Sequence, residues 1–165
     1  QAFGRAHNTQ LIGGALEPLY RPATSTAPAT LYFREDYPAS ALHEVAHWCI
    51  AGTQRRRQED FGYHYITGPR NAEDQVAFFE MELRTQSLER AFTLTLGLEF
   101  QPSADNVEAD IDAFTQAIQA HTPTLHDWLA SSAGARARTF IRALERTRER
   151  IAQDPHPPLA LGAAR

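Results

Sequence analysis

Residues 43–52 read HEVAHWCIAG and contain the motif H-E-x-x-H within a run of good helix formers. Side chains four residues apart on a helix project from the same face, so the imidazoles of His43 and His47 can reach one metal ion. Glu44, between them, is the residue that this motif uses as a general base in metallopeptidases. The alternative is an ordinary helix whose histidines bind nothing. The complete motif favours a metal site.

The sequence before this motif indicates a small sheet. Apolar residues in the segment 8–20 are interrupted by Gly13-Gly14, which predicts one or two strands with a turn. The segment 21–30 is rich in Pro, Thr and Ala and has few apolar side chains to bury, so we expect a loop there. The aromatic run at 31–34 predicts a further short strand.

Helices dominate the rest of the expected structure. The histidine helix should run over residues 38–51, with a proline near its start and Gly52 as its stop. Asn71 can cap a second helix. We expect a break or kink at Arg84-Thr85 and then a third helix over residues 87–96, which ends near Gly97.

Two more helices are expected towards the C-terminus. The fourth, kinked near Pro123, carries a core-facing stripe that consists of Ile111, Phe114, Ile118, His121, Leu125 and Trp128. The last should turn four apolar residues inward, namely Phe140, Ile141, Leu144 and Ile151. The segment 61–66 is expected to form a strand or an aromatic loop, and residues 154–165 a disordered tail.

The sequence thus predicts an α+β fold, in which a small mixed sheet packs against about five helices, one of them a metalloprotease-like metal helix. We expect residues 1–165 to form a single domain.

The composition excludes some classes of protein. Sixteen arginines, with no lysine, and twenty acidic residues give a formal net charge of −4, which argues against a general nucleic-acid binder. A single cysteine, Cys49, forms no internal disulfide and suggests a reducing compartment, so we expect the cytoplasm. We expect no membrane association, because no apolar run reaches the length of a membrane span.

The third metal ligand is not fixed by the motif. Metalloproteases and ribonucleases with three histidines need a histidine at position 53, which here is threonine. A glutamate from a downstream helix is the remaining arrangement, and Glu80 and Glu82 both qualify. They are two positions apart, so only one can face the histidines on a regular helix. His64 and His121 are further candidates.

Three consecutive arginines, Arg55, Arg56 and Arg57, follow the histidine helix. Such a run is ordinarily a solvated surface, and the alternative is a docking patch for an acidic partner.

Several segments together resemble one family. After HEVAHWCIAG and the arginine run come DFGY at 60–63, ELRTQSL at 82–88, DNVEAD at 105–110 and FIRAL at 140–144. This pattern, which extends over roughly residues 8–150, resembles the bacterial elongation factor P hydroxylase family. The resemblance implies a metal site of two histidines and one carboxylate, which fall on His43, His47 and Glu82.

The resemblance also implies a reaction, the hydroxylation of the β-lysylated lysine of elongation factor P with molecular oxygen. The expected metal is Fe(II), and zinc or another divalent ion is the alternative. Because the modified lysine is cationic, we expect Glu44, Asp60 and Glu80 to bind it, and we place Tyr63 with them. Two other classes stay open: a zinc metallopeptidase with Glu44 as its general base, and a metal-stabilised adaptor without enzymatic activity.

Overall fold

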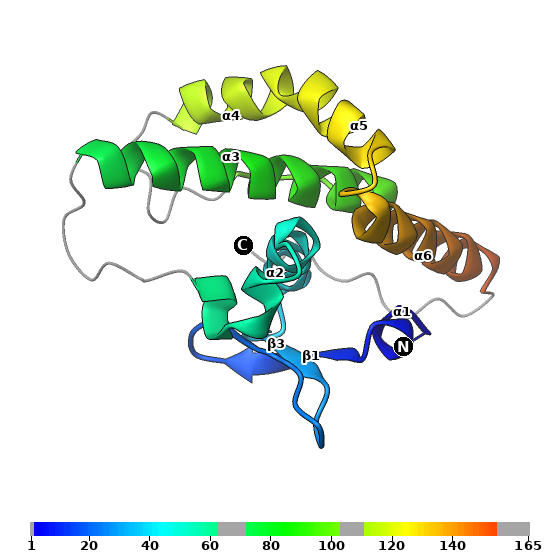
Figure 1. Ribbon diagram of the computed structural model, residues 1–165. Coiled ribbons are helices and arrows are strands. Elements are labelled where there is room, and N and C mark those ends of the chain that lie inside the picture. Colours follow the sequence, from blue (N-terminus) through cyan, green and yellow to red (C-terminus); the bar gives the residue numbers. More distant parts are fainter. Residues whose placement is uncertain (1, 63–71, 103–110, 155–165) are drawn as a thin grey trace.

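The computed structural model describes residues 2–62, 72–102 and 111–154 (Figure 1). Within these residues the helices and strands are, in chain order, α1 (Ala2–Ala6), β1 (Thr9–Ala15), β2 (Leu19–Arg21), β3 (Ala29–Arg34), α2 (Pro38–Ile50), the 3-10 turns η1 (Arg55–Arg57) and η2 (Glu59–Gly62), α3 (Ala72–Thr95), α4 (Ile111–Ala120), α5 (Thr122–Ala130) and α6 (Ala135–Gln153). None of the helices described combines the length and the apolar character that crossing a membrane would require.

The three strands form a mixed sheet in the order β1-β3-β2. β3 is the central strand, parallel to β1 and antiparallel to β2. The pairing of β1 with β3 shifts register between Ile12 and Ala15, where the chain contains Gly13 and Gly14. A Cβ atom at Gly13 would lie 2.8 Å from the Glu35 carbonyl oxygen, so glycine is needed for the close approach of these two segments.

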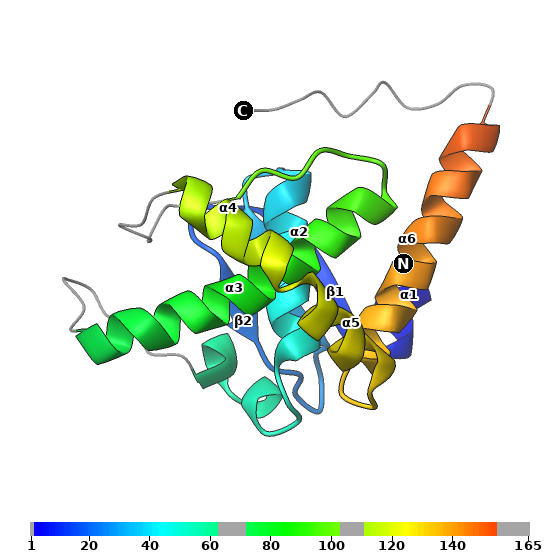
Figure 2. The same cartoon turned by 90° about the horizontal axis from the view of Figure 1, so that it is seen from above.

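The elements stack in layers around α2 (Figures 1 and 2). α2 packs against β3 of the sheet and against α3, and α4 and α5 lie along the other side of α3. α6 contacts α2, α3 and α5 near one end of this stack. The predicted α+β fold, a small mixed sheet packed against helices, is confirmed.

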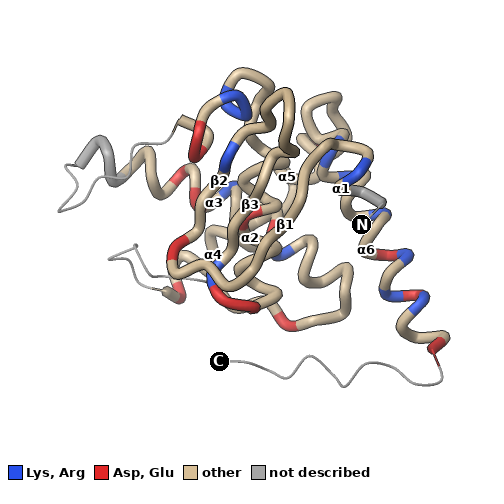
Figure 3. Tube along the Cα trace, turned by 90° about the horizontal axis from the view of Figure 1, so that it is seen from below, with Lys and Arg blue, Asp and Glu red and all other residues tan. Residues whose placement is uncertain are grey.

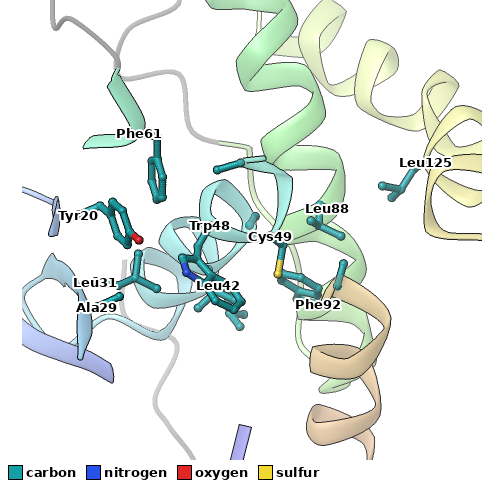
Figure 4. Packing of buried hydrophobic residues seen from close by; sticks show 14 residues of the cluster. Tyr20, Ala29, Leu31, Leu42, Trp48, Cys49, Phe61, Leu88, Phe92 and Leu125 are labelled. Atoms are coloured by element: carbon teal, nitrogen blue, oxygen red, sulfur yellow. The ribbon is translucent and has the colours of Figure 1, made fainter. Parts of the chain in front are cut away.

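The core is centred on α2. Leu42 and Val45 on this helix are buried, and Trp48 and Cys49 follow on its C-terminal half (Figure 4). Leu88 of α3 belongs to the same cluster. Burial raises the pKa of the Cys49 thiol, so this cysteine packs as a small apolar side chain.

The predicted bounds of the histidine helix agree with the structure. α2 begins at Pro38, whose fixed φ and missing N–H suit the first turn of a helix, and Ala51 is its C-cap. The predicted end of the later helix near Gly97 is also confirmed. Gly97 has φ +77, and the chain there closes with a hydrogen bond from the Leu98 amide to the Thr93 carbonyl.

The predicted break at Arg84-Thr85 is wrong, because α3 is continuous from Ala72 to Thr95. Thr85, Gln86 and Ser87 are buried, and the hydroxyls of Thr85 and Ser87 donate to carbonyls one turn earlier in the helix. These polar residues therefore belong to a buried helix face and do not mark a loop.

Two further predictions need correction. The fourth helix divides at His121 into α4 and α5, and Pro123 lies in the first turn of α5. Ile151 is 43% exposed and does not join the core, since α6 extends past the helices that cover its earlier turns. Phe140, Ile141 and Leu144 pack against the core as expected. The segments 63–66, Asn71 and 155–165 lie outside the described residues.

Candidate metal centre

His43 and His47 lie one turn apart on the face of α2 that meets α3. Their ring centroids are 4.7 Å apart, and their Nε2 atoms are separated by 3.1 Å. The His43 side chain is 22% exposed and the His47 side chain 13%, so both rings are largely shielded from solvent. The helical spacing therefore points two nitrogen donors at one position, as the motif predicts.

Glu82 of α3 supplies a third donor at this position. Its Oε1 atom lies 3.7 Å from His47 Nε2, and its Oε2 atom lies 3.9 Å from His43 Nε2. One donor atom from each of the three residues can be chosen so that all lie within 4.8 Å of one another, and in the described part of the chain this is the group that could hold a metal ion. Two imidazoles and one carboxylate are a donor set that suits Fe(II) or Zn²⁺.

A buried polar stripe on α3 supports these donors. The stripe begins at Glu82 and continues three, four and seven residues later with Thr85, Gln86 and Glu89. This spacing places all four side chains on one face of the helix. Thr85, Gln86 and Glu89 each contact one of the three candidate metal donors. Gln86 Nε2 donates to Glu82 Oε2 at 3.1 Å, and Thr85 Oγ1 lies 3.4 Å from Nδ1 of one histidine, His47.

Glu89 makes the strongest of these contacts. Its Oε2 atom lies 2.9 Å from His43 Nδ1, and the carboxylate is buried. A carboxylate that accepts the Nδ1 proton fixes the tautomer of an imidazole and leaves Nε2 free as a donor to metal. The sequence reasoning missed Glu89, Gln86 and Thr85, although their helical spacing from Glu82 was a usable signal.

The two histidines differ in their affinity for protons. Burial by itself lowers the pKa of His43, but the hydrogen bond and charge of Glu89, with the charges of Glu82 and Glu44, raise it to about 9. Burial, together with the charge of His43, holds the pKa of His47 well below its usual range. A metal ion that binds this group would therefore compete with a proton for His43.

Glu44 lies beside this group on α2. It is only 8% exposed, and its carboxylate makes no hydrogen bond with the residues that the structure describes. Burial raises its pKa to about 7; the charge of His43 opposes this shift, and the charges of Glu82 and Asp60 add to it. An acidic side chain that is buried without a partner is costly, which makes Glu44 a candidate functional residue.

The other expected site residues are placed differently. Asp60 accepts a hydrogen bond from the Tyr20 amide at 2.8 Å, so it ties η2 to β2. Glu80 is exposed and is not a member of the donor group. Tyr63 and His64 lie outside the described residues. His121 is half-buried between α4 and α5, and it too is absent from the donor group.

The fold and the site together define an α+β protein with a candidate two-histidine, one-carboxylate metal centre. Comparison with known proteins narrows this class. The family model described as elongation factor P hydroxylase matches residues 1–155. A protein of Haemophilus influenzae named elongation factor P lysine hydroxylase is 40% identical over 122 residues, which cover 72% of this chain and 68% of that protein. The chain belongs to the elongation factor P hydroxylase family, a family of enzymes, as the sequence resemblance predicted.

Proposed function

We propose that this chain hydroxylates the β-lysylated lysine of elongation factor P, with Fe(II) held by His43, His47 and Glu82. The observation that carries the proposal is the convergence of these three side chains from two helices in a chain of this family. A protein that modifies a translation factor would meet it in the cytoplasm.

Bound Fe(II) would supply the activation of oxygen, which side chains alone cannot provide. In the overall reaction, one atom of molecular oxygen enters a C–H bond, and the other leaves as water after taking up two electrons from an external reductant and two protons from the solvent. The protein residues have the task of holding the metal and the substrate. Glu89 orients His43, and Gln86 holds the Glu82 carboxylate, so both donors are in place before the metal arrives.

Charge explains how the cationic substrate side chain could be held. Glu44 is buried, its carboxylate accepts no hydrogen bond from the residues that the structure describes, and the charges of His43, Glu82 and Asp60 act on it. A substrate ammonium group that enters this region would supply the missing partner and would favour the ionised form of Glu44. Tyr63 and Glu80 stay predictions as substrate-binding residues.

The second candidate function is a zinc metallopeptidase. It is favoured by one observation, the position of Glu44 in H-E-x-x-H together with its pKa of about 7, which suits a general base. Family membership favours the hydroxylase.

The test is mass spectrometry of purified β-lysylated elongation factor P after incubation in air with the metal-loaded protein and an added reductant. We expect the modified peptide to gain one oxygen atom with Fe(II) and to be unchanged after chelation or with the His43→Ala variant. Metal analysis of each sample shows whether the variant has lost its metal. Hydrolysis of generic peptides, with no oxygen gain on the factor, would support the peptidase in its place.

A further inference from the structure

An open cavity of about 320 Å³ lies beside η1, and its lining includes none of the three candidate metal donors. Residues of β1, β2, β3, α2, η1 and the adjoining loops line it, among them His7, Tyr20, Trp48, Arg56 and Arg57. Among the described residues, the lining includes two arginines and no acidic side chain, although the chain as a whole is acidic. The basic η1 segment and the acidic η2 segment are adjacent in Figure 3. The described lining of the cavity is therefore positively charged, although an acidic segment lies next to it.

The structure separates the roles of the arginines in the run. Arg56 is half-buried and works within the fold, because its guanidinium donates to the Ala51 carbonyl at the end of α2 and lies 6.0 Å from the centre of the Trp48 ring. Arg57 is exposed, and its side chain makes no hydrogen bond or ion pair with the described residues. Arg55 is not among the lining residues. Among the described residues of the lining, Arg57 is thus a cation without a partner inside the protein.

The cavity has a fixed relation to the candidate metal centre. Tyr20, which lines it, stacks on Phe61 (Figure 4), with 4.1 Å between the ring centroids. The Phe61 ring in turn lies 6.4 Å from the ring of His47. Tyr20 is held at both ends, because its amide donates to Asp60 and its hydroxyl donates to the Arg56 carbonyl at 2.9 Å. Two ring contacts therefore connect the cavity to the donor group.

We propose that this cavity docks an acidic segment of the protein substrate, with Arg57 pairing with a carboxylate of that segment. The proposal rests on the proposed function, and it adds that recognition requires a folded acidic surface near the modified lysine. Guanidinium groups bind carboxylates through two parallel hydrogen bonds, and the lining holds no acidic residue that would compete. Docking there would place the neighbouring part of the substrate close to His47.

The experiment measures binding of β-lysylated elongation factor P to the metal-loaded protein at low and at high salt, by a surface biosensor. The variants are Arg57→Ala and Arg57→Glu, and the matched control is Arg150→Glu, an exposed arginine on α6. We expect Arg57→Glu to weaken binding roughly tenfold at low salt, mainly through slower association, with the difference shrinking at high salt. Arg57→Ala should lie between Arg57→Glu and the wild type. In the hydroxylation assay, the weaker binding of the substrate by Arg57→Glu should appear as a higher KM.

Other outcomes would overturn the proposal. Equal losses for Arg57→Glu and Arg150→Glu would mean that only net charge matters. Unchanged association for Arg57→Glu, with hydroxylation of the factor intact in the wild type, would remove the docking site and leave the proposed function standing. A wild type that binds the factor through Arg57 but never hydroxylates it would support the docking site and remove the proposed function.

Discussion

Glu89 is the residue through which α3 holds His43. The 2.9 Å contact between its carboxylate and His43 Nδ1 is buried, so little water competes for it. We expect Glu89→Ala to lower metal affinity by about 10- to 100-fold, and Glu89→Gln, whose amide oxygen still accepts the Nδ1 proton, to lower it less. A competition titration against a coloured chelator measures this.

The matched control for Glu89 is Glu80→Gln, an exposed change on the same helix that should leave metal affinity unchanged. Thermal unfolding of each variant shows whether the fold is intact. A folded Glu89→Ala variant that binds metal as tightly as the wild type would exclude this role for Glu89.

A substitution at Glu44 distinguishes the two candidate functions, the hydroxylase and the zinc metallopeptidase. In a peptidase Glu44 takes a proton from the attacking water, so Glu44→Gln would nearly abolish turnover. In the hydroxylase it binds the cationic side chain, so we expect Glu44→Gln to retain metal and residual hydroxylation, with the loss appearing mainly as a higher KM. Hydroxylation at rising substrate concentration, with metal analysis alongside, measures this. Complete loss at saturating substrate with metal still bound would make Glu44 a participant in the chemistry.

Among the elements, the packing of α2 against α3 decides the geometry of the donors. Leu88 lies on α3 next to the polar stripe and is fully buried, whereas Leu94 on the same helix is 46% exposed. We expect Leu88→Ala to lower the free energy of unfolding by about 2–5 kcal/mol, because it leaves a cavity between packed helices. Leu94→Ala should change it by less than about 0.5 kcal/mol. Urea denaturation measures the free energy of unfolding of both variants. Similar losses in this free energy at the two positions would contradict tight packing between α2 and α3.

α3 also shows where prediction from the sequence succeeded and where it failed. The helix around His43 and His47 was predictable, because its start, motif and stop are all local signals. α3 was predicted as two pieces, since its buried face carries the polar residues Thr85 and Gln86 and the apolar period is lost there. Spacing alone could not decide between Glu80 and Glu82, because that choice depends on which face of α3 meets α2.

At the scale of the whole molecule, two regions of opposite charge lie close together. Buried carboxylates, Glu44 among them, surround the candidate metal centre, and arginines line the cavity beside η1. A substrate that presents a cationic side chain next to an acidic surface matches both regions at once. This arrangement favours one site on a folded protein over free lysine-like amines, because a free amine can use only the first region.

The central claim is that hydroxylation depends on a metal ion held by His43, His47 and Glu82. The most direct test measures the mass of β-lysylated elongation factor P after reaction under oxygen gas labelled with the heavy isotope. The account predicts that the modified lysine gains one heavy oxygen atom with the Fe(II)-loaded wild type and none with Glu82→Ala. Unlabelled oxygen on the product, which would have to come from water, or an equal gain with Glu82→Ala, would contradict it.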